Sequence, residues 1–224
     1  APRGRDSYSR STWRSCATVA SDSPSLSESL AAFAAARSSS ASAFALSSPT
    51  RASSAAREID ENPLTGIANR KRFDEALRRA RRAAESDGTP MSLILCDIDF
   101  FKRFNDTWGH QTGDQIIRFV AGCLTRHSLE HHVVARYGGE EFGIVMPNTD
   151  TATATEIAEK IRKTVESKKL LRKSTNEDLG NITVSLGIAG YRDGESIEEL
   201  IERSDANLYK SKTEGRNRST SDAS

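Results

Sequence analysis

The chain has 224 residues, enough for one sizeable domain and an appendage. Its 32 basic and 31 acidic residues leave a net charge of +1, which argues against nucleic acid or an anionic membrane as a partner. Three cysteines without a CxxC pair argue against a disulfide framework or a zinc site, and no apolar run approaches the ~20 residues of a membrane span. We therefore expect a cytoplasmic protein with no membrane segment in this piece.

Residues 1–57 are dominated by Ser and Ala, with scattered Arg and few acidic residues. Such a composition buries too little apolar area to offset the entropy of ordering, so we expect a disordered tail or linker. An Arg- and Ser-rich start is also typical of an organellar transit peptide, and residues 26–37 could form a weak Ala-rich helix. One ordered domain is expected over 58–218, followed by a C-terminal tail over 219–224.

Apolar periodicity predicts alternating helices and strands in the ordered part. In chain order we expect a helix over 70–84, a buried strand over 91–96, a short helix and a loop within 100–114, a helix carrying 116–124, two strands at 133–137 and 142–146, a helix over 151–168, a strand over 182–189, and a helix over 196–213 that opens with a capping box of Ser196 and Glu199. This order predicts an α/β fold of the α+β sandwich type, with a small, mostly antiparallel sheet covered by helices.

The two middle strands are joined through Gly138 and Gly139. A Gly-Gly connection predicts a hairpin with a type I′ turn, because glycine takes positive φ without strain. Glu140 and Glu141 follow at once, and carboxylates packed so closely repel each other unless a cation lies among them. The stretch indicates a rigid turn that holds a metal against a substrate, although an ordinary solvated hairpin fits this segment equally well.

Five segments in this order resemble those of the GGDEF domain, the catalytic domain of diguanylate cyclases. They are NPLTGIANR (62–70), CDIDFFKRFNDTWGHQTGD (96–114), RYGGEEF (136–142), ITVSLGIA (182–189) and SDANLYKSKTEGRN (204–217). The resemblance implies a palm-like sheet similar to that of nucleotidyl cyclases, and a GGDEF catalytic domain over 58–218. It also implies that two GTP molecules are joined into cyclic di-GMP, with release of two pyrophosphates, by two-metal in-line transfer across a homodimer.

By this resemblance, Asp97, Glu140 and the backbone carbonyl of Ile98 hold Mg²⁺, with Mn²⁺ as an alternative ion. Glu141 is then either a general base toward the 3′-hydroxyl or a ligand of a second metal, and Glu140 and Glu141 are the catalytic pair. Consecutive strand residues point to opposite faces, so the two glutamates share a site only if the turn twists them together. The simpler alternative leaves Glu141 on the solvated surface.

The resemblance assigns the guanine base to Asn105 and Asp114, with His110 lining the pocket between them. A carboxylate can accept hydrogen bonds from guanine N1–H and N2–H₂ together, whereas adenine presents an acceptor at N1, so such a site discriminates strongly. Local alternatives are a helix-ending role for Asn105, an N-cap role for Asp114 and a structural role for His110.

The triphosphate is assigned to Lys212 and Arg216 and to the backbone amides of Phe100, Phe101 and Lys102 at the start of the short helix. Lys212 and Arg216 are four residues apart near the end of the final helix, so they are expected to reach the same point. The alternatives are basic residues that complement the helix dipole and phenylalanines that belong to the core.

Some positions depart from the family pattern. Many relatives carry an inhibitory Arg-x-x-Asp motif before the two glycines, and here Leu129 and His132 occupy the matching positions, so we expect weak or no feedback inhibition through it. Asn62 stands where an acidic residue is common, and Ile67 where Leu is common. Two other functions are considered: a catalytically silent module that binds GTP or cyclic di-GMP, and another palm-type nucleotidyl cyclase. Retention of all three acids argues against silence.

Overall fold

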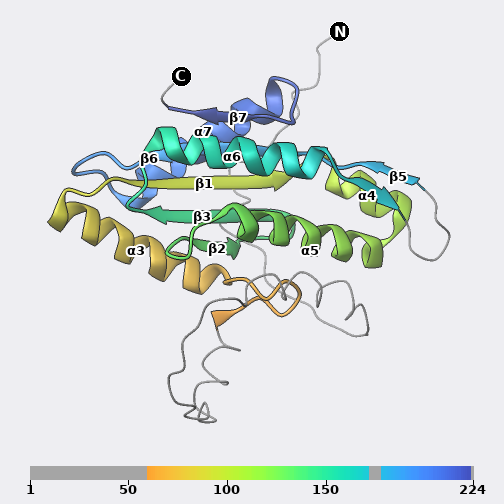
Figure 1. Ribbon diagram of the computed structural model, residues 1–224, viewed down its shortest axis with the longest axis horizontal. Coiled ribbons are helices and arrows are strands. Elements are labelled where there is room, and N and C mark those ends of the chain that lie inside the picture. The colour runs from red at the N-terminus through yellow and green to blue at the C-terminus, as the bar shows by residue number, and fades with distance from the viewer. Residues whose placement is uncertain (1–59, 172–177, 223–224) are drawn as a thin grey trace, which may run out of the picture. The chain divides into compact units, whose positions relative to one another are not determined.

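The computed structural model describes residues 60–171 and 178–222, so the expectations for residues 1–57 lie outside the described part. Within it, the centre is a five-stranded sheet in the order β2-β3-β1-β6-β7 (Figure 1). These strands are β1 (Met91–Ile98), β2 (Val133–Arg136), β3 (Glu141–Pro147), β6 (Val184–Gly190) and β7 (Ser219–Ser221). β1 pairs antiparallel with both β3 and β6, and β7 joins β6 in parallel. The predicted mostly antiparallel sheet is confirmed.

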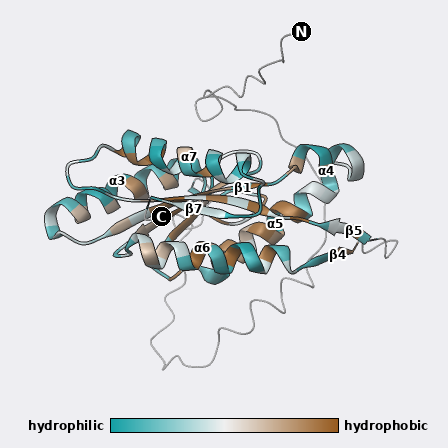
Figure 2. Ribbon diagram, turned by 90° about the horizontal axis from the view of Figure 1, so that it is seen from above, coloured by the Kyte–Doolittle hydropathy of each residue, from teal (hydrophilic) through white to brown (hydrophobic). Residues whose placement is uncertain are grey.

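Helices cover both faces of this sheet (Figure 2). They are α3 (Arg70–Asp87), α4 (Phe101–Trp108), α5 (His110–His127), α6 (Thr151–Glu166) and α7 (Ile197–Thr213). α5 and α6 share one hydrophobic core with alternate residues of β1, β3 and β6, while α3 and α7 lie on the opposite side of the sheet. All eight residues of β1 are buried, as expected of a central strand between two helical layers. The capping box at Ser196 and Glu199 is confirmed.

α7 lies directly against the backbone of β6. A Cβ atom added at Gly187 would overlap the carbonyl of Ser204 and the amide of Leu208, so only glycine allows this approach. The close packing places the C-terminal end of α7 beside the C-terminal end of β1, because β1 and β6 are antiparallel neighbours.

Two features were not predicted from the sequence. β4 (Lys169–Leu171) and β5 (Asp178–Asn181) form a separate two-stranded sheet, and β7 lies in the segment expected to be a C-terminal tail. β7 has the sequence Ser-Thr-Ser, with no apolar alternation to mark it as a strand. It is held by hydrogen bonds, including one from the Leu186 amide to the Arg218 carbonyl at 2.9 Å.

We predict that Gly187→Ala destabilises the domain by about 1–3 kcal/mol, because the new methyl group must push α7 away from the sheet. Gly122→Ala is the matched control: a Cβ at this exposed site on α5 would meet nothing within 4 Å, and alanine should stabilise the helix by up to about 1 kcal/mol. Chemical denaturation of both variants measures the difference. Equal stabilities would contradict the close packing of α7 on β6.

Candidate active site

The connection between β2 and β3 is wider than a two-residue turn, since residues 137–140 lie between the strands. Neither Gly138 nor Gly139 has a positive φ, so the predicted type I′ geometry is wrong. The amides of Tyr137 and Gly138 both donate to the carbonyl of Glu141, at 2.8 and 3.1 Å. This closure accommodates four residues without a left-handed conformation.

Space explains the glycine at position 138, whereas nothing in the structure requires the one at position 139. A Cβ at Gly138 would overlap the carboxylate of Glu141, whose side chain folds over the turn, while a Cβ at Gly139 would meet nothing within 4 Å. Arg136 holds the turn from the strand side, donating from Nε to the Gly138 carbonyl at 3.1 Å and from Nη2 to the Gly139 carbonyl at 2.7 Å. The turn is therefore fixed by a guanidinium group and remains open at its tip.

The adjoining ends of β1 and β3 bring the predicted metal and catalytic residues together. Asp97 is the ladder partner of Glu141, and the Ile98 amide donates to the Glu140 carbonyl at 3.3 Å. Asp97 is buried, while the two glutamates are partly exposed. The two strand ends thus pair Asp97 with Glu141 and place Glu140 beside them at the end of the turn.

Electrostatic coupling supports a single site. Burial, followed by the charge of Asp97, raises the pKa of Glu140 and raises the pKa of Glu141 to about 7. Burial also raises the pKa of Asp97, and the Lys212 ammonium, 2.7 Å from Asp97 Oδ2, opposes that shift. The charge of Asp97 thus raises the pKa of both glutamates, and Glu140 also raises the pKa of Glu141, so a cation would relieve the repulsion among these acids.

The donor set fits a hard divalent cation. Carboxylate and carbonyl oxygens are the ligands that Mg²⁺ takes, usually one or two carboxylates with substrate phosphates completing the shell. No group of three or more His, Cys, Asp or Glu side chains in 60–171 and 178–222 is arranged as a complete metal site by itself. Asp97, Ile98 and Glu140 therefore fit a cation that protein and substrate hold jointly.

Arg216 reaches the site by a different route from the one predicted. It does not share a helix face with Lys212, because α7 ends before Gly215, whose φ is 117°. Arg216 lies in a left-handed conformation with φ of 62°, and its guanidinium lies 4.4 Å from the centroid of the Phe100 ring. Both Lys212 and Arg216 lower the pKa of Asp97, so the two cations still converge on the same acid.

The start of α4 lies beside these cations, since its N-cap Phe100 contacts Arg216. Phe100 is its N-cap in a left-handed conformation (φ of 56°), and no side chain caps the helix. The first amides of a helix have no partner within it, so those of Phe101 and Lys102 are available to an anion. The Phe101 side chain belongs to the core, as the simpler reading expected, whereas the Phe100 ring is 60 % exposed.

The predicted base-binding residues lie where α4 meets α5. The Oδ1 atom of Asn105 is buried and has no hydrogen-bond partner among the described residues. It leans over Gly113, where an added Cβ would overlap it, and Asp114 is the next residue along α5. A buried acceptor without a donor costs about 1–3 kcal/mol, which is unusual for a residue with a purely structural role.

The local alternatives for these residues do not hold. α4 continues past Asn105 to Trp108, and the N-cap of α5 is Gly109 rather than Asp114. His110 is the exposed first residue of α5, which gives it no structural role in the core.

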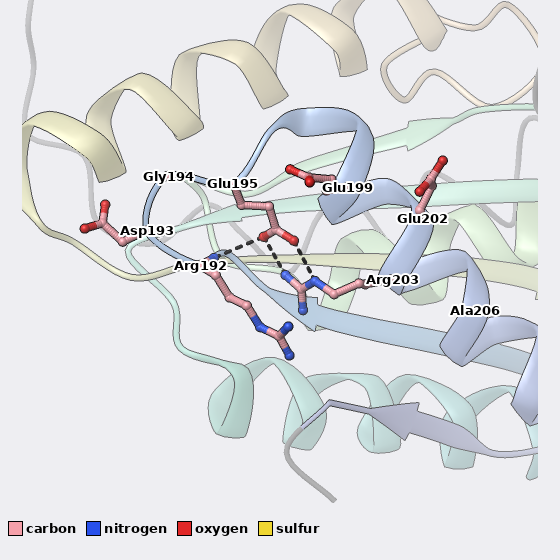
Figure 3. Close-up of a pocket in the computed structure, with 8 residues that line it drawn as sticks. All are labelled: Arg192, Asp193, Gly194, Glu195, Glu199, Glu202, Arg203 and Ala206. Carbon is pink, nitrogen blue, oxygen red and sulfur yellow. Dashed lines mark hydrogen bonds and ion pairs between the residues drawn. The ribbon is translucent and has the colours of Figure 1, made fainter.

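A hollow lies elsewhere, lined by residues between 192 and 206 at the start of α7 (Figure 3). Its Arg203 is bound by Glu195 and by the Gly190 carbonyl. Gly190 pairs with Ser92, at the opposite end of β1 from Asp97. This hollow is therefore separate from the carboxylate cluster.

Comparison with known proteins identifies the family. A family model described as "Diguanylate cyclase, GGDEF domain" matches residues 59–218. The chain belongs to the GGDEF family. It is 39% identical over 155 residues to diguanylate cyclase VdcA of Vibrio cholerae, covering 69% of this chain and 44% of that protein. It is also 39% identical over 155 residues to response regulator PleD of Caulobacter vibrioides, covering 69% of this chain and 34% of that protein.

This GGDEF chain thus spans less than half the length of these two curated relatives. It also resembles the crystal structure of the GGDEF domain of DgcB from Caulobacter crescentus in complex with c-di-GMP. The TM-score is 0.72 and the identity 51%, covering 74% of this chain and 96% of that one. The family and the fold expected from the five sequence segments are confirmed.

Sequence reasoning missed Arg136, which supports the turn of this GGDEF domain. Its guanidinium also reaches Oδ1 of Asn62 at 3.4 Å, and that oxygen accepts hydrogen bonds from the amides of Leu64 and Thr65. The departure at Asn62 therefore places a neutral acceptor beside Arg136. An arginine directly before a glycine-rich turn was the available signal, because exposed carbonyls there need donors.

We predict that Glu141→Gln, without metal or nucleotide, stabilises the domain at about pH 8 but not at about pH 5. The raised pKa of Glu141 means that the folded state keeps a proton between about 4.5 and about 7 that the unfolded state releases, so wild-type stability falls as pH rises through this window. Thermal denaturation in a chelator measures the difference. Glu202→Gln, at an exposed carboxylate on α7, is the control. A Glu141→Gln effect that is independent of pH would contradict the coupling.

Proposed function

We propose that this chain is a diguanylate cyclase that condenses two GTP molecules into cyclic di-GMP and releases two pyrophosphates. The observation that carries the proposal is the convergence of Asp97, Glu140 and Glu141, with Lys212 against them, at the adjoining ends of β1 and β3. Names of curated relatives at 39% identity support the same activity. Because GTP is a cytoplasmic metabolite, we also propose a cytoplasmic location.

The reaction requires a 3′-hydroxyl to attack an α-phosphorus in line while pyrophosphate leaves. A bound Mg²⁺ or Mn²⁺, held by Asp97, Ile98 and Glu140, would supply charge stabilisation on the phosphate oxygens. Glu141, with a pKa of about 7, is partly ionised near neutral pH and is suited to accept the proton of the attacking hydroxyl.

The cations and amides beside the carboxylates bind the part of GTP that leaves. Lys212 acts as a point charge and Arg216 as a planar fork toward the β- and γ-phosphates. The amides of Phe101 and Lys102 donate to the same oxygens from the start of α4. Developing negative charge on pyrophosphate is thereby stabilised by groups that are already in place.

In this proposal, guanine selection depends on residues where α4 meets α5. We propose that Asp114 accepts from guanine N1–H and N2–H₂, that the buried Oδ1 of Asn105 accepts a further donor, and that His110 flanks the entrance. Adenine would leave these acceptors without donors, and unpaired buried polar groups are what makes such discrimination strong.

One domain offers one set of these groups and therefore holds one GTP. Two copies must face each other so that each 3′-hydroxyl reaches the other nucleotide, which requires a two-fold symmetric homodimer. A silent binding module would not need Asp97 close to both glutamates. Repulsion between these carboxylates lowers the stability of the fold, so the arrangement favours a catalytic role.

We predict that the 224-residue chain with Mg²⁺ converts GTP, but not ATP, into the cyclic dinucleotide, with a rate that rises more than linearly with protein concentration. Asp97→Asn should lower kcat by at least about 10²-fold, because charge stabilisation at the reacting phosphate is lost. Asp193→Asn, at an exposed carboxylate near the start of α7, is the control. Chromatographic product identification decides between the functions: an ATP product would favour another nucleotidyl cyclase, and no product would favour a silent module.

We predict little feedback inhibition through positions 129 and 132. His132 is buried, and its ring nitrogens lie 3.2 Å from the Leu129 amide and 3.0 Å from Thr149 Oγ1. Burial lowers its pKa to about 4, so it is neutral near pH 7 and cannot act as a charged phosphate ligand. In calorimetry, the wild-type chain should bind cyclic di-GMP weakly, or with an affinity that His132→Ala does not change. Tight binding lost in this variant would refute the prediction.

A further inference from the structure

Three residues with a left-handed backbone conformation lie close to Asp99, a buried carboxylate that has no role in the proposed reaction. Four non-glycine residues in the described part of the chain have positive φ, and three of them are Phe100 (56°), Arg216 (62°) and Asn217 (47°). Phe100 directly follows Asp99, and the amide of Asn217 donates to that carboxylate. Such conformations cost about 1–3 kcal/mol each and persist only where the surroundings fix them, commonly at functional sites.

Asp99 accepts hydrogen bonds on both of its oxygens. Oδ1 accepts from Ser185 Oγ at 2.7 Å, and Oδ2 accepts from Thr183 Oγ1 at 2.7 Å and from the Asn217 amide at 3.0 Å. Asp99 is 5% exposed, so a charge there requires these partners. It joins the end of β1 to β6 and to the chain that follows α7.

Asn217 is held from a second side by α6. Its Oδ1 accepts from Arg162 Nη1 at 2.9 Å, and its Nδ2 donates to Glu166 Oε1 at 2.6 Å. Asn217 thus connects the carboxylate of Asp99, through its amide, with two charged groups of α6, through its side chain. Asparagine is among the few residues that take a left-handed conformation readily, which suits this position.

Arg216 lies directly before this clamp. Its amide donates to the Ser211 carbonyl at 3.0 Å, and its guanidinium stacks over the Phe100 ring. The backbone on both sides of Arg216 is therefore fixed, while its guanidinium lies beside the first turn of α4. An arginine that is already placed loses less side-chain entropy when it binds a phosphate.

We propose that Asp99 and Asn217 are positioning residues, which together hold the left-handed turn that presents Arg216 to the terminal phosphates of GTP. The inference rests on the proposed function, because that function assigns the phosphates to Arg216. It gives the second acid of the Asp97–Asp99 pair a role distinct from that of the first: Asp97 faces the reacting groups, and Asp99 fixes a group that binds the substrate.

The test compares the affinities of GTP and GMP with Mg²⁺, because GMP lacks the phosphates assigned to Arg216. In Asp99→Asn, an amide group replaces an oxygen where three donors converge, so the turn should loosen. We expect GTP binding to weaken by about tenfold and GMP binding to change by less than about twofold. In an Arg216→Ala background, Asp99→Asn should add less than about twofold, because the group that it positions is gone.

Two further variants keep the test decisive. Asn217→Gly keeps the left-handed backbone and the hydrogen bond from the amide of residue 217 to Asp99, but it removes both side-chain links to α6. We expect this variant to weaken the binding of GTP and not that of GMP. It decides the question if Asp99→Asn does not fold. Ser92→Ala is the matched control, since it removes a buried hydroxyl bond, to the Thr149 carbonyl at 2.9 Å, at the other end of β1. It should lower stability without changing the GTP-to-GMP affinity ratio.

The outcomes separate this inference from the proposed function. If Arg216→Ala weakens GTP binding but Asp99→Asn and Asn217→Gly do not, the positioning role is overturned while the phosphate role of Arg216 stands. Equal weakening of GTP and GMP by Asp99→Asn would show a merely structural role and would also overturn it. If Arg216→Ala leaves GTP affinity unchanged, the phosphate assignment itself fails, and the inference fails with it.

Discussion

Repulsion among three carboxylates is the constraint on which the rest of this domain depends. Asp97 raises the pKa of Glu140 and of Glu141, and Glu140 also raises the pKa of Glu141. The sheet register keeps Asp97 beside Glu141, because the two residues are paired across β1 and β3. A fold tolerates such repulsion only if the elements that carry the acids are fixed by other forces. Those forces are the buried core on both faces of β1 and the guanidinium of Arg136 inside the turn.

The same repulsion explains the placement of the basic residues. Lys212 is brought to Asp97 by a helix that contacts the backbone of β6 at Gly187, and Arg216 is brought there by a turn after the helix ends. Two cations from one chain segment thus have different partners: Lys212 pairs with Asp97, and the guanidinium of Arg216 lies over the Phe100 ring. Under the proposed function, Lys212 would move from Asp97 toward a phosphate once a divalent cation binds the acids, since its ammonium is a point charge on a flexible stem.

Much of this arrangement could be predicted from sequence because it depends on local patterns. Apolar periodicity predicts the helices and the strands β1, β2, β3 and β6, and the five motif segments mark the candidate site residues. The turn type could not be predicted, because it depends on Arg136 reaching the carbonyls of Gly138 and Gly139. β7 could not be predicted either, since Ser-Thr-Ser becomes a strand only through its partner β6. The four-residue spacing of Lys212 and Arg216 implied a shared helix face, but α7 ends at Thr213, so Arg216 reaches the site from the turn that follows.

Asp97 and Asp99 show why a motif cannot by itself assign chemistry to each of its residues. They lie two positions apart at the end of one strand and are buried to a similar degree, yet their partners differ. Asp97 forms an ion pair with the ammonium of Lys212 and lies near two other acids. Asp99 instead accepts hydrogen bonds from two hydroxyl groups and a backbone amide. Environment separates the roles of like residues in many active sites. Here Asp99, whose partners are neutral donors from β6 and the Arg216 turn, is suited to hold that turn in place. Asp97, whose partners are charged, is suited to replace one charged partner with another.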